Sequence, residues 1–226
     1  MQNTIWIASF DIGKINFAFC IEEIDTTELQ KIPNIVLKTR YNEDGTPTSD
    51  MNKILEQVYN NGKIILFKNS NLTTNCIKGS YLDPETFHNL TDLLDQYRMY
   101  WNKCSAFVIE QQMSFRGKRN PMAIKLGQHC YSYFCFMYGR FKTVIEFPAF
   151  HKTRILGAMK IQIKKRWKNM NKPMRKKWTI SKASAILQKR GNDYSILQQS
   201  KKKDDLADVF CQLQAFKYLA YIDKSI

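Results

Sequence analysis

The chain has 226 residues, of which 44% are hydrophobic, so it can bury one substantial core and is expected to form a single domain, 1–226. Its net charge of +15 suits a nucleic acid or an anionic membrane surface. No run of about 18 apolar residues is present, which argues against a membrane-spanning helix, and the N-terminal residues show no targeting signal.

The first half of the sequence predicts strands and then a helix. Apolar and β-forming residues indicate three strands, at Thr4–Phe10, Asn16–Ile24 and Ile32–Thr39. Met51–Tyr59 has the pattern of a short helix, and the polar residues 60–82 predict an irregular insertion.

The second half predicts helices that alternate with strands. Asp83-Pro84 begins a helix that is expected to run to about Trp101, with Asp83 as its N-cap. The elements that follow are a strand at Ala106–Glu110, a long helix at Pro121–Tyr138, a strand at Phe141–Phe147 and a closing helix at Leu206–Tyr221. For 160–182 the pattern does not separate helix from loop. This order predicts an α/β fold, with a mixed five-stranded sheet flanked by helices.

The positive charge is concentrated in the second half of the chain. Residues 1–100 carry 13 acids and 9 bases, whereas residues 111–192 hold 20 Lys and Arg and a single acid, Glu146. Such a separation favours a directed surface for a polyanion over a generally basic exterior. The six cysteines show no paired spacing, so we expect reduced thiols in a reducing intracellular compartment, and His129-Cys130 with Cys135 lacks the partners of a zinc site.

Isolated carboxylates flank this basic stretch. Asp11 and Glu110 each end a predicted buried strand, where the alternatives are an Asx-turn at Asp11 and a helix approach at Glu110. Asp205 and Asp208 lie three residues apart on a predicted helix and therefore share a face. Asp204 could cap that helix, but Asp208 lies a full turn inside it among apolar residues and needs a cation. Four such carboxylates could bind two Mg²⁺ or Mn²⁺ ions, the arrangement used in phosphodiester hydrolysis.

The order of these acids resembles the RuvC-type Holliday junction resolvases of the ribonuclease H-like superfamily. Ile109-Glu110-Gln111 followed by Ala123-Ile-Lys-Leu-Gly-Gln128 resembles the strand and helix around the family's catalytic Glu, and Pro148-Ala-Phe-His-Lys152 resembles its Pro-x-x-x-Lys. Phe10-Asp-Ile-Gly13 and Asp204-Asp-Leu-Ala-Asp208 look most like the branch from poxviruses and related large DNA viruses.

The resemblance implies roles for individual residues. Asp11, Glu110, Asp205 and Asp208 would bind metal, Asp204 would be a helper or a cap, and Lys152 would lie beside the metals, where an ammonium could stabilise the phosphate in the transition state. In this family an apolar wedge follows the catalytic strand and enters the junction centre, and Met113 or Phe115 would fill that role. The expected contacts with DNA phosphates are Arg116, Lys118, Arg119, Lys164, Lys165, Arg166, Lys176 and Lys177. Trp167 and Trp178 could stack on bases or pack in the core.

The expected function is therefore cleavage of branched DNA. We expect a homodimeric, Mg²⁺-dependent endonuclease that resolves four-way junctions by two symmetric cuts, because a two-fold dimer matches the symmetry of the junction. The alternatives are a ribonuclease H-like nuclease acting on RNA–DNA hybrids and a basic DNA-packaging protein without catalysis. As the location in the cell, a virus factory, a nucleus or a mitochondrion would each be compatible with this sequence. The helix at 123–138 is apolar on more than one face, which predicts a dimer surface with Tyr131, Phe134, Met137 and Tyr138 pointing outward.

Overall fold

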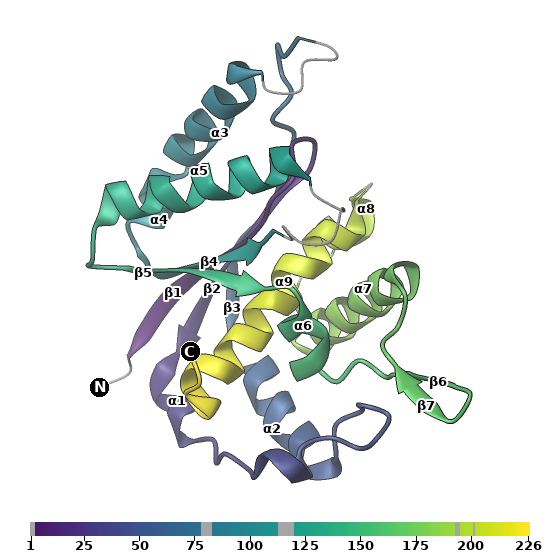
Figure 1. Cartoon of the computed structure of the whole chain (residues 1–226). Helices are drawn as coiled ribbons and strands as arrows, with labels where there is room; N and C mark the ends of the chain where they lie inside the picture. The colour runs from purple at the N-terminus through teal and green to yellow at the C-terminus, as the bar shows by residue number, and fades with distance from the viewer. Residues whose placement is uncertain (1–2, 78–82, 113–119, 193–194, 201) are drawn as a thin grey trace.

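A mixed five-stranded sheet in the order β3-β2-β1-β4-β5 forms the centre of the computed structural model, which describes residues 3–77, 83–112, 120–192, 195–200 and 202–226 (Figure 1). The strands are β1 (Thr4–Asp11), β2 (Phe17–Asp25), β3 (Lys63–Ser70), β4 (Cys104–Gln111) and β5 (Thr143–Pro148). β2 pairs antiparallel with β1 and β3, whereas β4 pairs parallel with β1 and β5. The predicted α/β class and the mixed five-stranded sheet are confirmed.

Helices cover both faces of the sheet (Figure 1). One face carries α3 (Pro84–Gln96), α4 (Arg98–Trp101) and α5 (Pro121–Tyr138). On the other face lie α2 (Ser49–Asn60), α6 (Phe150–Ile155), α7 (Lys172–Lys189) and α9 (Lys203–Lys217). The remaining elements are α1 (Thr26–Lys31), a 3₁₀ turn (Leu37–Thr39), the small hairpin β6 (Ile161–Ile163) and β7 (Arg166–Lys168), α8 (Ser195–Gln199) and a π-helical turn (Tyr218–Asp223).

The two cores follow from the period of two along the strands. In β1, Ala8 and Phe10 pack under α3, α4 and α5, whereas Ile7 points to the opposite face and packs under α9. In β4 the same alternation sends Phe107 and Ile109 to the first face and Val108 to the second. The residues that follow on the α9 side are Ser9 and then Asp11 in β1, and Glu110 in β4. Both acids therefore lie on the face that α9 covers.

Most of the predicted elements are confirmed. The helix expected at Pro121–Tyr138 has these bounds, and Asp83 caps α3 by accepting from the Glu85 backbone N–H. The third strand was predicted wrongly: Ile32–Thr39 contains only the 3₁₀ turn, with Val36 exposed, and the strand lies in the supposed irregular stretch, at Lys63–Ser70. β3 is an edge strand in which Phe67 is buried and the other side chains are partly or wholly exposed. Its apolar run, Ile64-Ile-Leu-Phe67, is only four residues long and lies in an otherwise polar stretch, which is why the strand was missed.

A buried ionic cluster fixes the end of α9 to β2. Glu22 is fully buried and accepts from Arg190 and from Lys217, whose Nζ lies 3.1 Å from Glu22 Oε2. Gln214 Nε2 donates to the same oxygen at 3.2 Å. Burial by itself raises the pKa of Glu22, but the charges of Arg190 and Lys217 outweigh it and the pKa is lowered. Glu22 is therefore held as an anion within the core.

This cluster predicts a large stability effect. Glu22→Gln leaves two cations in the core without a counter-ion and should lower the free energy of unfolding by about 3–5 kcal/mol, measured by urea denaturation at neutral pH. Because the pKa of Glu22 is lower in the folded chain than in the unfolded one, its contribution is complete above the unfolded pKa and is lost as the pH falls through the folded pKa. The difference in the free energy of unfolding between wild type and Glu22→Gln should therefore become smaller at acidic pH.

The matched control is Glu28→Gln, which removes an exposed i,i+3 pair with Lys31. It should change stability little, because water and salt screen an exposed pair. Equal effects of the two substitutions would contradict the structural role given to Glu22.

Candidate active site

The site begins where two parallel strands end side by side. In the β1–β4 register Phe10 is the partner of Ile109, so Asp11 and Glu110 are neighbours at the C-terminal ends of their strands. Period-two alternation turns both carboxylates toward α9. The sequence pattern of a buried strand that ends on an acid therefore did identify two groups that meet.

α9 brings the third set of carboxylates. Its first turn carries Asp204 and Asp205, and Asp208 follows one turn later, flanked by the fully buried Ala207 and Val209. The side chain of Asp208 faces the strand ends, because its carboxylate oxygen Oδ1 is 3.2 Å from the ammonium of Lys152, which also contacts Glu110.

Gln212 holds α9 in this position, a role that the sequence analysis missed. Its side chain is fully buried one turn after Asp208, and its Nε2 lies 3.1 Å from Ser9 Oγ, 3.3 Å from the Phe10 carbonyl and 3.0 Å from the Val108 carbonyl. One amide thus links α9 to both strands that carry the acids. The available signal was the i+4 spacing from Asp208, which places a polar residue on the inward face of the helix.

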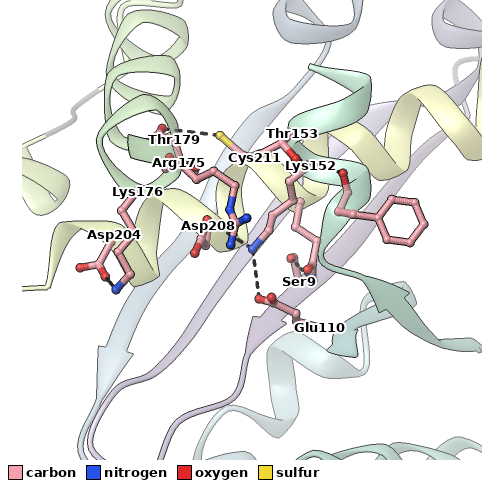
Figure 2. Close-up of polar contacts among 12 residues, drawn as sticks. Ser9, Glu110, Lys152, Thr153, Arg175, Lys176, Thr179, Asp204, Asp208 and Cys211 are labelled. Carbon is pink, nitrogen blue, oxygen red and sulfur yellow. Dashed lines mark hydrogen bonds and ion pairs between the residues drawn. The ribbon is translucent and has the colours of Figure 1, made fainter. Parts of the chain in front are cut away.

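Lys152 is the central cation of the site (Figure 2). It lies on α6, only 5% of its surface is exposed, and its Nζ is 3.1 Å from Glu110 Oε2 and 3.2 Å from Asp208 Oδ1. Burial lowers the pKa of Lys152, but Glu110, Asp208 and Asp11 outweigh this and raise the pKa above its ordinary value. The ammonium therefore keeps its proton.

The carboxylates carry more negative charge than Lys152 balances. Burial raises the pKa of Asp11 well above its ordinary value, Glu110 raises it further, and Lys152 opposes the rise. Burial likewise raises the pKa of Asp208, against the effect of Lys152. Within the described residues, no three Asp, Glu, His or Cys side chains surround a point that could hold a metal ion in this conformation. The Lys152 ammonium lies between two of the acids instead.

A second lysine pairs with the start of α9. Lys176 on α7 forms an ion pair with Asp204, which Figure 2 shows beside the Lys152 contacts. Burial raises the pKa of Asp204, but the hydrogen bond from Lys176 outweighs it and the pKa is lowered. For Asp205, burial and then the charge of Asp204 raise the pKa to about 6. Lys176, expected to contact DNA, thus also positions α7 against α9.

The other expected contacts lie on the surface or outside the described residues. Lys177 is exposed on α7, and Lys164, Lys165 and Arg166 are exposed on the small hairpin. Trp178 packs against the core on the α9 side, whereas Trp167 is 40% exposed and joins neither core. The five expected residues of the segment after β4 all fall outside the described part of the chain: Met113, Phe115, Arg116, Lys118 and Arg119.

The cysteine side chains are free thiols, as expected from their spacing. All six cysteines are free, and four of them are buried. His129 Nε2 is 2.8 Å from Thr91 Oγ1, so this ring has a hydrogen-bonding partner within the protein. No helix in the described residues has both the length and the apolar character needed to cross a membrane.

Two viral proteins are similar to this chain over almost its whole length. Uncharacterized protein 170L of Invertebrate iridescent virus 6 is 36% identical over 257 residues, which cover 99% of this chain and 93% of that protein. The chain belongs to the 170L family of the iridescent viruses. A second member, uncharacterized protein 97L of Invertebrate iridescent virus 3, is 32% identical, with 93% of this chain and 98% of that protein covered. No family model matches the chain.

Solved structures show that this member of the 170L family has the RuvC-type, ribonuclease H-like fold. The fowlpox virus resolvase in complex with its substrate Holliday junction DNA is 18% identical, with a TM-score of 0.54 over 96% of this chain and 99% of that chain. RuvC of Thermus thermophilus in complex with a Holliday junction substrate is 8% identical, with a TM-score of 0.52 over 96% and 97%. The yeast mitochondrial Holliday junction resolvase is 11% identical, with a TM-score of 0.55 over 97% and 80%.

The Gln212 contacts generate a prediction about stability. Gln212→Leu keeps the approximate volume but removes the donor to β1 and β4, so the free energy of unfolding should fall by about 1–3 kcal/mol in urea denaturation. Gln128→Leu is the matched control, because Gln128 is exposed on α5 and bonds only to Ser132 among its described contacts. If Gln212→Leu were as stable as the control, α9 would not depend on this amide.

Proposed function

We propose that this protein is a structure-selective endonuclease that resolves four-way DNA junctions through two symmetric cuts, each made by one subunit of a homodimer. The observation that carries the proposal is the meeting of acids from β1, β4 and α9 around the Lys152 ammonium. Support comes from the fold, whose solved examples include resolvases with Holliday junction DNA.

The donor set fits hard divalent cations. Asp11, Glu110, Asp205 and Asp208 offer only oxygen ligands, the type that Mg²⁺ and Mn²⁺ prefer. Lys152 and Lys176 together do not balance five acidic groups, counting Asp204, so cations would be bound at a site with excess negative charge. Two such ions, held by these carboxylates, would supply the activation of water and the stabilisation of charge on the leaving 3′ oxygen.

Lys152 acts in this proposal as a fixed positive charge. Because its raised pKa keeps the ammonium protonated, it cannot serve as a general base. Its position between Glu110 and Asp208 puts the ammonium where a phosphate between those carboxylates would develop negative charge. An ammonium held there by the fold can stabilise a pentavalent phosphate without large rearrangement. Gln212 and Lys176 are positioning residues that act through α9.

The basic surface favours a nucleic-acid substrate over the non-catalytic alternative. A packaging protein needs the exposed lysines but has no use for acids that are buried near the same surface, because they repel phosphates. A ribonuclease H-like activity on RNA–DNA hybrids remains the second candidate, since it would use the same carboxylates. The poxvirus-like motifs Phe10-Asp-Ile-Gly13 and Asp204-Asp-Leu-Ala-Asp208 favour junction DNA over hybrids.

The residues available for a dimer surface on α5 differ from those expected from the sequence. Phe134 was expected to point outward and is fully buried against Phe107, so that assignment is wrong by about half a helical turn. Phe136, two residues later, is 89% exposed, and Phe141 beyond the helix end is 97% exposed. Tyr131, Met137 and Tyr138 are partly buried. Two large exposed aromatic rings at one end of α5 support pairing through this region.

The catalytic roles are tested by separating binding from cutting. Asp208→Asn should abolish cleavage while junction affinity stays equal or rises, because a negative charge is removed from the site. Lys152→Ala should lower the cleavage rate by about 10²-fold or more, with affinity nearly unchanged. Junction binding and single-turnover cutting with Mg²⁺ measure both effects.

The controls are Asp92→Asn on α3, on the opposite face of the sheet, and Lys189→Ala, whose partner is Glu56. Both should cut as wild type does. A wild-type cleavage rate for Asp208→Asn would contradict the assignment of the acids. If Lys152→Ala binds the junction poorly but cuts it at the normal rate at saturating protein, Lys152 only contacts a phosphate and does not act in the chemical step.

The assembly is tested at Phe136. Phe136→Glu should yield a folded monomer that no longer makes paired cuts, because a charge replaces the most exposed ring of α5. Val36→Glu, at a similarly exposed apolar residue far from α5 in the sequence, should leave the dimer intact. Light scattering at micromolar concentration gives the mass of each. A wild-type protein that is monomeric both with and without junction would overturn the dimer.

A further inference from the structure

The β6–β7 hairpin, Ile161–Lys168, projects from the body of the protein between α6 and α7 (Figure 1). All residues from Gln162 to Asn169 are exposed, so the hairpin adds almost nothing to either core. A two-stranded hairpin of three-residue strands is marginal by itself. Its presence is therefore not explained by the stability of the fold.

The two residues in the turn of this hairpin are unfavourable for the backbone conformation that they adopt. Ile163 pairs with Arg166, which leaves a two-residue turn, and Lys164 and Lys165 have φ angles of 47° and 62°. Positive φ at both central positions is the type I′ pattern, for which Asn-Gly is strongly preferred and β-carbon-bearing lysines are disfavoured. Three adjacent cations, Lys164, Lys165 and Arg166, also repel one another. Among the ion pairs of the described residues, none includes these three.

The base of the hairpin is fixed to the protein. The Lys160 backbone N–H donates to the Asp44 carbonyl at 2.6 Å. Gly157 has a φ of +76°, and a β-carbon there would lie 2.3 Å from the Pro47 ring, so only glycine permits this close approach. The hairpin is thus held by the loop around Asp44 and Pro47, while its turn extends into solvent.

The two faces of the hairpin carry different side chains. In the antiparallel pairing Gln162 is opposite Trp167, so these two share one face, whereas Arg166 and Lys168 share the other with Ile161 and Ile163. The ribbon therefore offers a Trp and an amide on one side and cations on the other and at the turn. A two-stranded ribbon of this kind can enter the major groove of a duplex, with its cations against the phosphates.

We propose that the β6–β7 hairpin binds a duplex arm of the DNA substrate away from the cleaved bond, with Lys164 and Lys165 on phosphates and Trp167 against the groove wall. This inference rests on the proposed function and adds a separate arm-binding element to it. α6 precedes the hairpin and carries Lys152, and α7 follows it and carries Lys176, so the arm contact is joined at both ends to elements that reach the acids. The hairpin contributes to affinity and not to the chemical step.

The test replaces the lysines by the residues that the turn prefers. Lys164→Asn with Lys165→Gly should fold and be at least as stable as wild type, which separates loss of function from misfolding. In an Asp208→Asn background, junction affinity should fall by about tenfold, and the slope of log affinity against log salt should decrease by roughly 2, about 0.9 for each lost phosphate contact. Single-turnover cutting at saturating protein, measured without the Asp208 change, should stay at the wild-type rate.

The matched control is Lys31→Asn with Lys63→Asn, two exposed lysines at the opposite end of the sheet from the acids. It should leave affinity and slope unchanged. A junction with shortened arms gives a further check. Shortening the arms should lower the junction affinity of the parent protein but have little additional effect on the affinity of the hairpin variant. Trp167→Ala should weaken binding without altering the salt slope.

The possible results distinguish failure of the proposed function from failure of the hairpin role. An Asp208→Asn parent that fails to bind any junction overturns the proposed function and the hairpin role together. A parent that binds, with a hairpin variant of equal affinity and salt slope, overturns the hairpin role alone. Equal losses in the hairpin variant and in the control pair would show a general charge effect and also overturn the arm contact.

Discussion

One buried ammonium joins the three parts of the candidate active site. Lys152 contacts Glu110 on β4 and Asp208 on α9 at 3.1 and 3.2 Å, and it is supplied by a third element, α6. Burial raises the pKa of Asp11 and Asp208, the neighbouring carboxylates raise it further, and Lys152 opposes the rise. The ammonium therefore allows the acids to converge. The same charge is also available to a phosphate that enters between them.

The acids stay in place because α9 is fixed along its length by buried polar groups. Gln212 binds β1 and β4 near the acids, and Lys217 and Gln214 bind Glu22 on β2 further along the helix. Apolar packing alone would tolerate small shifts of a helix across a sheet, whereas these hydrogen bonds and ion pairs have defined directions. The position of Asp208 relative to Glu110 is consequently set by contacts with the three central strands, β2, β1 and β4.

The sequence predicted what depends on local pattern and missed what depends on contacts between distant residues. Runs of apolar and β-forming residues and the Asp83-Pro84 helix start predicted most of the sheet and most helices. Isolated acids at predicted strand and helix ends pointed to Asp11, Glu110, Asp205 and Asp208, whose catalytic role stays a prediction. β3 was missed because its apolar run is short and lies among polar residues, and Phe134 was misplaced because α5 is apolar on several faces. The Lys176–Asp204 pair could not be derived, since it forms only when α9 meets α7. The i+4 spacing from Asp208 places Gln212 on the inward face of α9, but its partners on β1 and β4 appear only in the structure. Lys152 was identified through family resemblance, and its bridging contacts came only from the structure.

The central claim is that this acidic site, with its lysine, cuts branched DNA. The most direct measurement incubates the purified protein and Mg²⁺ with a synthetic four-way junction, a linear duplex of the same sequence and an RNA–DNA hybrid, and maps the products on both strands. The account predicts paired nicks at symmetric positions in two opposed strands of the junction, with 5′-phosphate and 3′-hydroxyl ends, and no comparable cutting of duplex or hybrid. Cleavage confined to the RNA strand of the hybrid, or junction binding without cleavage in both Mg²⁺ and Mn²⁺, would contradict it.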